Sequence, residues 1–407
     1  MAQQISLKEA AELARSGDAH AQYALSSVLH ERGRFDESLH WLGLAAGQKL
    51  APAQMTLAVL LMDGRRCPRD RQRAVDLLQP LAATEIQANL LLSELHGFAA
   101  LGGAGGEAGL HYLFAAARMG DAGALRQLAL LSACHRRWDL VGPLLNASAR
   151  RGDAGAARSL DRCRGGAIPG VPRPSASEPP ELCIDWLLLE QALPQLAAEI
   201  ALPIAETLNE TPRVSRLAGV IPLLVLDAII HGAEPLVRRS QIVDARTGEM
   251  RADPMRTSSH VTLGPRQHDH VLEALERCIS RISGLPALNG EFLQILRYRP
   301  GEEFKPHVDY FNEGGAGTYQ SLADGGQRAQ TVLLYLNADY TGGSTYFPRL
   351  RLDFRGRPGD MLHFHNLGTD GLGHKDSLHA GMPVLTGEKW LLSQWIRSDR
   401  YPARLAW

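Results

Sequence analysis

The sequence has few cysteines, and those it has are not arranged as pairs. Five are spread over 407 residues, the number is odd, and no two of them form a Cys-x-x-Cys motif. This argues against a zinc knuckle and against the disulfide framework of a small secreted domain. We therefore expect the chain to work in a reducing compartment, the cytoplasm. The cysteines are Cys67, Cys134, Cys163, Cys183 and Cys278.

A strong net charge and long apolar runs are also missing. The net charge of -1 gives no general attraction to nucleic acid or to an anionic membrane. No apolar run approaches the length of a membrane span, and the first residues lack the basic start and apolar core of a secretory signal. We expect neither nucleic acid nor a membrane as a partner. The content of 45% hydrophobic and 21% charged residues is typical of a globular protein, and 407 residues predict two or three domains.

The N-terminal part repeats itself. Alanines in similar surroundings recur with spacings of 32, 35, 36 and 32 residues. A period in this range is typical of stacked helix pairs, each too small to bury its apolar face alone. Glycines fall where these helices should end. The alanines are Ala21, Ala53, Ala88, Ala124 and Ala156, and the glycines are Gly33, Gly47, Gly64, Gly120 and Gly152.

These units resemble Sel1-like repeats, the tetratricopeptide-related type of helix pair. The resemblance covers residues 6–163 and depends on the period, on the Ala-Gln pairs, and on the segments 45–47 (AAG) and 116–120 (AARMG). It implies an all-α helical-repeat solenoid of four helix pairs and a final helix, with a surface for a protein partner or a neighbouring domain. The alternative is an alanine-rich helical bundle whose spacing is accidental.

The composition changes after the repeats. Residues 164–180 are rich in proline, glycine and serine and indicate a linker, and a leucine- and alanine-rich pattern over 181–211 predicts a helical spacer. From residue 212 onward, two helical stretches near 220–230 and 269–282 accompany short strand-like runs. Together they predict an α+β domain with a jelly-roll, or double-stranded β-helix, core. The strand-like runs are 292–298, 331–337, 344–347, 361–365 and 390–396.

Near the C-terminus a histidine and a carboxylate stand two residues apart. In a β-strand the side chains of His307 and Asp309 would point to one face, where a histidine from a neighbouring strand could complete three ligands. Two histidines and one carboxylate on one face of a metal leave the opposite positions open, as in non-haem Fe(II) oxygenases. Alone, the pair could equally be a surface pair. For the third ligand His374 competes with His379, because both precede Lys389.

Other histidines have simpler explanations. His268 and His270 form a second His-x-His pattern, but it opens a predicted helix in which Asp269 serves as a cap. His363 and His365 lie on a predicted strand, where we expect them to support the structure or the metal ligands.

The C-terminal half resembles the prolyl 4-hydroxylase branch of Fe(II)- and 2-oxoglutarate-dependent dioxygenases. The resemblance covers residues 212–399, and its motifs follow the order of the family. They are 256–258 (RTS), 296–298 (LRY), 306–311 (PHVDYF), 325–328 (GGQR), 331–337 (TVLLYLN), 342–348 (GGSTYFP), 358–360 (PGD), 379–384 (HAGMPV), 387–390 (GEKW) and 395–397 (WIR).

The resemblance implies three metal ligands, four residues around the co-substrate and one residue at the peptide end of the site. The implied ligands of Fe(II) are His307, Asp309 and His379. Lys389 would pair with the distal carboxylate of 2-oxoglutarate; the other residues of that pocket would be Tyr298, Thr331 and Trp395. Arg328 would lie at the peptide end. The implied cofactors are Fe(II), 2-oxoglutarate and ascorbate.

Two positions depart from the pattern of the family. Phe304 stands where many members carry tyrosine, and Arg397 stands where collagen-type members have histidine. Both lie on the substrate side, so we do not expect collagen as the substrate. We expect a dioxygenase that hydroxylates a proline of a protein or peptide, with the repeats recruiting the target. The alternatives are a non-catalytic repeat scaffold with a vestigial or sensing oxygenase fold, and a cupin-like metal enzyme of another reaction class.

Overall fold

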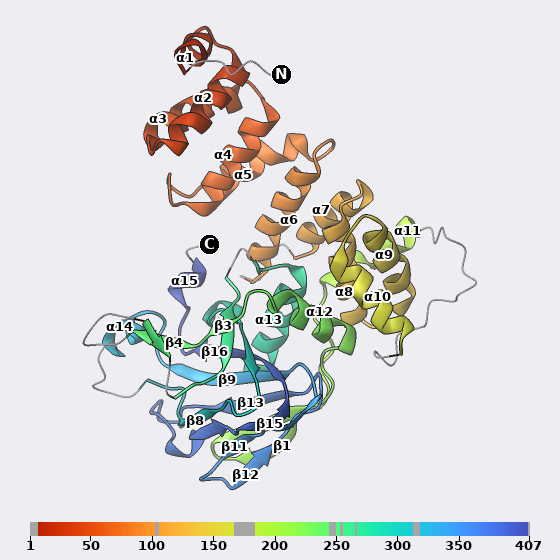
Figure 1. Cartoon of the computed structure of the whole chain (residues 1–407), viewed down its shortest axis with the longest axis vertical. Coiled ribbons are helices and arrows are strands. Elements are labelled where there is room, and N and C mark those ends of the chain that lie inside the picture. The colour runs from red at the N-terminus through yellow and green to blue at the C-terminus, as the bar shows by residue number, and fades with distance from the viewer. Residues whose placement is uncertain are drawn as a thin grey trace. The chain divides into compact units, whose positions relative to one another are not determined.

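The computed structural model describes residues 7–101, 106–166, 184–243, 250–252, 255–264, 267–311 and 318–405. The chain forms two compact units, one holding residues 1–99 and 105–124 and the other residues 100–104 and 125–406 (Figure 1). The second unit therefore begins within the region of the expected repeats. The linker expected over 164–180 lies largely outside the described residues, and the domain boundaries expected from the sequence stay predictions.

Ten helices are described in the region where stacked helix pairs were expected. The repeated alanines fall on every second helix, and Ala53, Ala88, Ala124 and Ala156 are completely buried. The prediction of a helical-repeat region is confirmed, with one helix more than expected. None of the described helices is long and apolar enough to cross a membrane. The helices are α1 (Leu7–Arg15), α2 (Ala19–Glu31), α3 (Phe35–Gly47), α4 (Ala51–Asp63), α5 (Arg71–Leu78) with the short 3-10 turn η1 (Gln79–Leu81), α6 (Ile86–Leu101), α7 (Gly106–Arg118), α8 (Ala122–Cys134), α9 (Trp138–Arg150) and α10 (Ala154–Arg164).

The sequence around the repeated alanines explains where the helices begin and end. Asp18 caps α2 by accepting the N–H of Ala21 at 2.6 Å, and Asp153 caps α10 by accepting the N–H of Ala156 at 2.7 Å. Gly64 ends α4 with a φ of 72°, a left-handed conformation that glycine adopts without steric cost. The cap and the buried alanine therefore belong to one repeated signal.

Residues 184–217 combine a helix with a β-hairpin. Helix α11 (Trp186–Ala197) begins at Asp185, whose carboxylate accepts the N–H of Leu188 at 2.9 Å. The helix expected through residue 211 is wrong in its last part, because β1 (Glu206–Glu210) pairs with β2 (Arg213–Leu217) and β2 pairs with a strand of the main sheet. The mostly polar strand β1 has no clear apolar alternation of its own, and cross-strand pairing fixes its place.

Two antiparallel sheets form the framework of the C-terminal part. The larger has the strand order β1-β2-β13-β9-β16-β7-β6-β3 and the smaller the order β12-β11-β14-β8, with β10–β15 and β4–β5 as separate pairs. The remaining strands are β3 (Arg238–Arg239), β4 (Gln241–Val243), β5 (Met250–Ala252), β6 (Ser259–Thr262), β7 (Gln294–Tyr298), β8 (Phe304–His307), β9 (Arg328–Tyr335), β10 (Tyr340–Gly342), β11 (Thr345–Phe347), β12 (Leu352–Phe354), β13 (Met361–His365), β14 (His379–Gly381), β15 (Val384–Gly387) and β16 (Lys389–Arg397). The helices are α12 (Leu223–Ala233), α13 (His270–Ser283), η3 (Ala287–Asn289), α14 (Thr318–Ala323), η4 (Lys375–Ser377) and α15 (Pro402–Leu405).

A shared apolar core joins the two sheets. Tyr335 and Phe364 of the larger sheet pack with Phe347 of the smaller one, and all three are completely buried. On the other face of the larger sheet, Gln394 of β16 approaches Glu276 of α13, with Nε2 at 3.4 Å from Oε1. The expected α+β domain with a double-stranded β-helix core is therefore confirmed, and α13 lies on the other face of the larger sheet.

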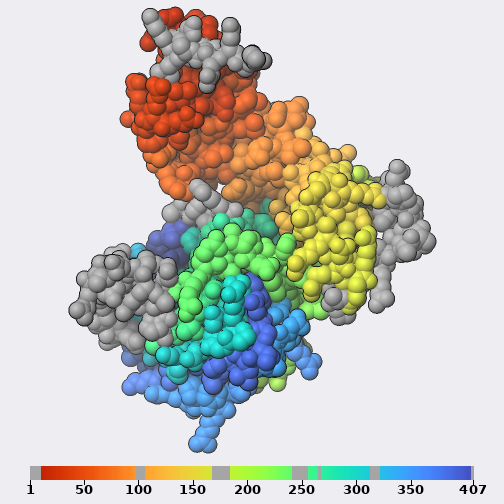
Figure 2. All heavy atoms as spheres, in the orientation of Figure 1, coloured from red at the N-terminus to blue at the C-terminus, as the bar shows by residue number. Residues whose placement is uncertain are grey.

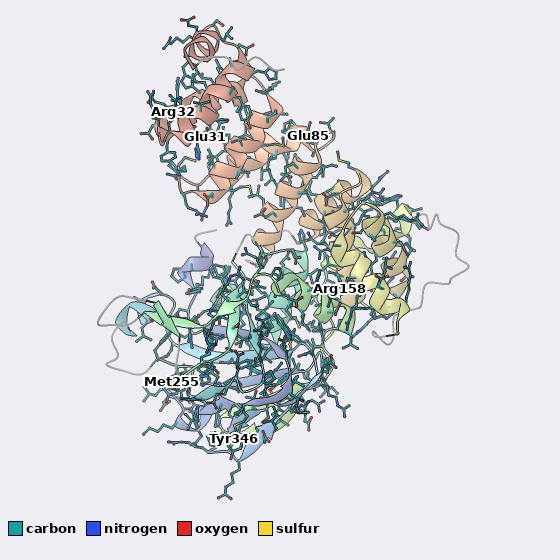
Figure 3. The ribbon with its side chains drawn as sticks, in the orientation of Figure 1. Glu31, Arg32, Glu85, Arg158, Met255 and Tyr346 are labelled. Atoms are coloured by element: carbon teal, nitrogen blue, oxygen red, sulfur yellow. The ribbon has the colours of Figure 1, made fainter. Side chains whose placement is uncertain are left out.

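Helix α10 packs on α12 within the second unit. Nε of Arg162 lies 2.8 Å from Oδ1 of Asp227, and Nε of Arg158 lies 3.8 Å from Oδ2 of the same carboxylate. Figure 2 shows the yellow atoms of α9 and α10 against the green atoms around α12, and Figure 3 labels Arg158 on this side. The last helix pair is thus held to the β-sheet domain by ion pairs as well as by packing.

Candidate metal centre and co-substrate pocket

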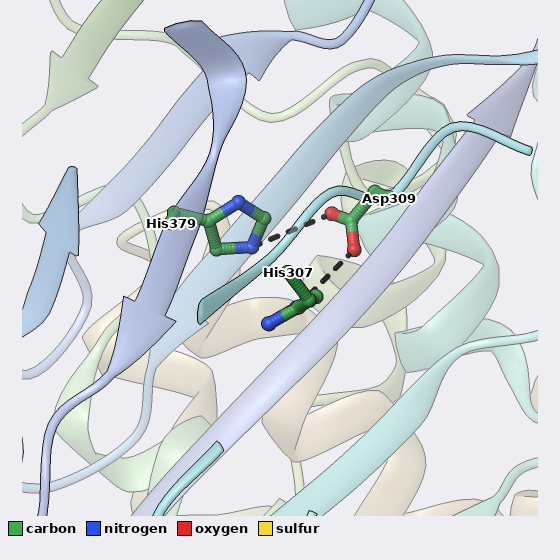
Figure 4. A group of neighbouring side chains, drawn as sticks. All are labelled: His307, Asp309 and His379. Carbon is green, nitrogen blue, oxygen red and sulfur yellow. Dashed lines mark ion pairs between the residues drawn. The ribbon is translucent and has the colours of Figure 1, made fainter. Parts of the chain in front are cut away.

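Three potential metal ligands meet at the edge of the smaller sheet. His307 is the last residue of β8 and His379 the first of β14, and the two lie opposite each other in the antiparallel register. Asp309 follows two residues after the end of β8. One ligand atom from each residue lies within 4.8 Å of the others. Figure 4 shows the two histidine rings on either side of the Asp309 carboxylate. His374 lies outside this cluster; it caps η4, with Nδ1 accepting the N–H of Asp376 at 3.2 Å.

Backbone carbonyls fix the tautomer of both histidines. Nδ1 of His307 donates to the carbonyl of Lys305 at 2.7 Å, and Nδ1 of His379 donates to the carbonyl of Ser377 at 2.9 Å. Because a carbonyl only accepts, the proton of each neutral ring sits on Nδ1 and leaves a lone pair on Nε2. Those Nε2 atoms face Asp309, at 3.5 Å for His307 and 3.7 Å for His379. These nitrogen lone pairs repel the negative charge of the Asp309 carboxylate unless a cation lies between them.

Burial and the neighbouring side chains together determine which of the three ligands are charged. It lowers the pKa of His379 to about 4, so this ring is neutral at pH 7. Burial also opposes a charge on Asp309, but the two histidines in their protonated forms and the hydroxyl of Thr331 outweigh it and hold the pKa of Asp309 below its usual value. Two imidazole nitrogens and one ionised carboxylate are a donor set that suits Fe(II) with open positions. The residues present therefore fit the metal.

A pocket runs from the triad along one face of β16. Side chains alternate between the faces of a strand, and Lys389, Leu391, Ser393 and Trp395 all line this pocket together with the triad. Six residues along a strand span about 20 Å. Lys389 and Trp395 both line the pocket, as the resemblance implied, and they lie at its opposite ends.

Lys389 is a buried cation at the inner end of this pocket. It is 2% exposed, and its ammonium donates to the carbonyl of Gly343 at 2.7 Å. Nζ lies 5.4 Å from the ring centres of both Tyr298 and Tyr335. Burial, with a smaller contribution from the nearby Arg355 guanidinium, lowers the pKa of Lys389 to about 7. No carboxylate in the described part of the chain forms an ion pair with it, so the pocket is built to receive an anion.

Tyr298 lines the pocket, whereas Thr331 is not among the residues that line it. Tyr298 is directly opposite Lys389 in the pairing of β7 with β16. Thr331 lies opposite Trp395, at the far end of that strand, and its hydroxyl donates to Oδ2 of Asp309 at 2.7 Å. The hydroxyl of Thr331 therefore contacts the metal triad instead of the region around Lys389, where we expected it.

Arg328, at the start of β9, is held by an aromatic ring and a carboxylate. Its guanidinium carbon lies 3.5 Å from the ring centre of Trp395, and its nitrogens approach both oxygens of Glu291 at 2.7 and 3.0 Å. Arg397 shares that carboxylate, with Nε at 2.6 Å from Oε1. The two arginines therefore share one acid beside the Trp395 end of the pocket.

Phe304 stacks on a metal-ligand histidine. Its ring lies 3.5 Å from the ring of His307, centre to centre, at an interplanar angle of 14°. Three other histidines discussed from the sequence have structural partners. His268 pairs with Glu276 and His270 pairs with Glu273, at 3.0 and 2.9 Å. His363 contacts Gln330 at 2.6 Å, away from the metal.

The comparisons agree with this geometry. Residues 293–397 match the 2OG-Fe(II) oxygenase superfamily. Over 206 residues the chain is 38% identical to prolyl 4-hydroxylase 1 of Arabidopsis thaliana, which covers 47% of this chain and 71% of that protein. The chain belongs to the prolyl 4-hydroxylase family of 2-oxoglutarate- and Fe(II)-dependent oxygenases.

This chain is also similar to two solved structures. One is the viral collagen prolyl hydroxylase of Paramecium Bursaria Chlorella virus-1, with 23% identity, a TM-score of 0.35, and coverage of 45% of this chain and 95% of that chain. The other is a Sel1 repeat protein from Oxalobacter formigenes, with 20% identity, a TM-score of 0.35, and coverage of 47% of this chain and 77% of that chain.

Membership of the prolyl 4-hydroxylase family confirms the expected reaction class. The chain is a 2-oxoglutarate-dependent dioxygenase, and the family implies Fe(II) and 2-oxoglutarate as its cofactors. Ascorbate and the roles of individual residues stay predictions.

Three residues of this oxygenase site were not given a role from the sequence. Arg256 lines the pocket and donates to Ser258 at 3.2 Å; its place in a family motif was the available signal. Glu291 and Asn366 belong to none of the motifs described from the sequence. Their partners come from strands far away in the sequence, so no short-range pattern reveals these contacts. Glu291 holds two arginines, and Asn366 contacts Thr331.

Proposed function

We propose that this chain hydroxylates a proline of a protein or peptide, with His307, Asp309 and His379 holding Fe(II) and Lys389 holding 2-oxoglutarate. The observation that carries the proposal is the buried ammonium of Lys389. It lines the same pocket as the triad, whose nitrogen lone pairs and carboxylate would be stabilised by a bound cation. One pocket therefore offers a site for a cation at the triad and a site for an anion at Lys389. This combination suits a metal ion together with a dicarboxylate co-substrate.

The reaction inserts one oxygen atom into a C–H bond. When bound, Fe(II) and 2-oxoglutarate activate dioxygen: one oxygen atom goes to the substrate as a hydroxyl, and 2-oxoglutarate becomes succinate and CO2. Lys389 neutralises the far carboxylate of the co-substrate, an interaction strengthened by burial. Leu296, Leu333 and Leu391 line the pocket and keep water from the reacting atoms.

The substrate reaches the pocket from the end marked by Trp395. Arg328 covers that ring, and both Phe304 and Trp395 line the pocket. Flat apolar rings suit a proline ring, and Arg328 carries the charge that a peptide backbone or acidic side chain meets first. The helical repeats recruit the target, and ascorbate keeps the metal reduced. The compartment is the cytoplasm, because the cysteines of the sequence are odd in number and not arranged in pairs.

Succinate release tests the proposal. Purified full-length protein with Fe(II), ascorbate, 2-oxoglutarate and a panel of proline-containing peptides should release succinate in proportion to hydroxyproline. His307→Ala and Asp309→Ala should lose this activity, whereas His374→Ala, a matched histidine outside the triad, should retain it. Absence of peptide-stimulated turnover across the panel would instead favour the vestigial or sensing scaffold.

A further inference from the structure

Asn366 is a fully buried amide beside the metal triad. It follows β13 directly and is 0% exposed. Its backbone is fixed on both sides, because its N–H donates to the carbonyl of Ala329 and its carbonyl accepts the N–H of His374, each at 2.8 Å. Its side-chain Nδ2 donates to Oγ1 of Thr331 at 2.9 Å. The amide is therefore held firmly where it meets the threonine hydroxyl.

The donors and acceptors in this contact fall into one order. An amide NH2 only donates, so Thr331 accepts from Asn366 and has its single hydroxyl hydrogen left for Oδ2 of Asp309, at 2.7 Å. With the amide turned over, Thr331 would face two acceptors with one hydrogen. The order Asn366 to Thr331 to Asp309 is the arrangement in which the threonine hydroxyl satisfies both neighbours.

The surroundings of Thr331 make a purely structural role a poor explanation. The following residues of β9, Val332 to Leu334, are apolar and buried, and a valine would fill the site of Thr331 equally well. Asp309 lies beyond the end of β8, so strand pairing does not hold it. The hydroxyl of Thr331 therefore fixes the orientation of the Asp309 side chain, which backbone pairing does not fix.

We propose that Asn366 and Thr331 are positioning residues that keep the Asp309 carboxylate turned toward the two histidines. The proposal rests on the metal site of the proposed function and goes beyond it by assigning a pair of residues to the site's assembly. Neighbours that hydrogen-bond a metal ligand commonly change metal affinity by about 10–100-fold. The effect of Asn366 passes through the hydroxyl of Thr331.

A double-mutant cycle on metal affinity tests this order. Co(II), a redox-stable probe, is titrated into metal-free full-length protein and followed by calorimetry and by its absorption bands. Thr331→Val should weaken Co(II) binding by about 10–100-fold, while Thr331→Ser, which keeps the hydroxyl, should stay near wild type. Asn366→Ala should weaken binding in the wild-type background and have no further effect when Thr331→Val is already present. Asn366→Leu, which keeps the volume, replaces it if the alanine variant does not fold.

Gln330→Leu is the matched control. Gln330 is the buried neighbour on β9 whose side chain contacts His363 on the opposite face, so its loss should lower stability and leave Co(II) affinity unchanged. The proposal is overturned if Thr331→Val binds Co(II) like wild type, or if Asn366→Ala weakens binding equally in both backgrounds. Failure of the wild-type protein to bind Co(II) would overturn the metal site itself, a separate result.

Discussion

The Lys389 ammonium donates to the carbonyl of Gly343 at 2.7 Å inside a pocket that it shares with the metal triad. A carbonyl stabilises a buried ammonium only in part, and the pKa of Lys389 accordingly falls to about 7. An anionic ligand would restore the charged form. Ligand binding and protonation of Lys389 are therefore linked.

This linkage predicts that 2-oxoglutarate affinity depends on pH. Below pH 7 Lys389 is already charged, whereas above pH 7 binding must take up a proton, so affinity should fall by up to about tenfold per pH unit. Titration of 2-oxoglutarate from pH 6 to pH 9 measures the slope. Lys389→Arg, a permanent cation, should remove it, and a flat profile for the wild-type protein would contradict the prediction.

The same pKa predicts a stability effect with the opposite slope in the ligand-free protein. The unfolded chain keeps Lys389 protonated up to a pKa near 10.5, so between pH 7 and 10.5 it binds more protons than the folded chain. The contribution of Lys389 to the free energy of unfolding should therefore rise with pH across that window. Lys389→Met should lose this rise in denaturant titrations.

Gly343 is predicted to be essential for the position of Lys389. Its φ is +64°, and a Cβ there would lie 3.0 Å from Val384 and 3.3 Å from Cδ of Lys389. Gly343→Ala should cost about 1–2 kcal/mol of backbone strain and weaken 2-oxoglutarate binding roughly tenfold. Gly219→Ala is the control, because Gly219 has a φ of +61° with open space around it. It should show the strain alone in unfolding experiments, and equal losses of ligand affinity would refute the proposed contact.

The sequence predicted the metal triad and Lys389 because short-range patterns determine their geometry. Alternation along β16 places Lys389 and Trp395 on one face, and the pairing of β14 with β8 selects His379 instead of His374. The shared face follows from strand spacing once the strand is recognised, whereas the choice of His379 came from the resemblance to the family. The repeats were predictable for a similar reason, because a period of 32 to 36 residues reflects a local helix pair.

The partner of Thr331 and the hairpin before the domain could not be predicted in this way. Asp309 lies beyond the end of its strand, so its contact with Thr331 depends on how two sheets face each other. Strand β1 is mostly polar, and only its pairing with β2 fixes it as a strand. Both outcomes are set by long-range register, for which a single sequence carries little signal.

Glu291 is predicted to be the main stabilising acid near the Trp395 end of the pocket. It is 8% exposed and pairs with Arg328 and Arg397. Glu291→Gln leaves two guanidinium groups without an anion and should lower the free energy of unfolding by about 3–5 kcal/mol. The exposed pair of Glu388 with Arg299 provides the control, since Glu388→Gln should cost less than about 1 kcal/mol. Similar losses in both variants, measured in urea, would argue against a special role for Glu291.

The ion pair between α10 and α12 predicts that the last helix pair and the β-sheet domain unfold together. Asp227 is 8% exposed, and two arginines of α10 approach it, although their side chains are about 40% exposed and solvent weakens the pairing. Asp227→Arg should cost about 1–3 kcal/mol, because it brings three cations together. Combining it with Arg162→Asp should recover part of that loss in a denaturant titration.

Asp161→Arg is the matched control for this charge reversal. Asp161 lies on α10, the helix that carries Arg158 and Arg162; its side chain is 77% exposed, and Arg164 approaches it at 3.7 Å. Because water screens this pair, its reversal should change the free energy of unfolding by less than about 0.5 kcal/mol. If the Asp227→Arg variant matches this control, or if the double exchange recovers nothing, α10 does not stabilise the domain through Asp227. Recovery by the exchange would show that the charge pair itself couples the last helix pair to the oxygenase fold.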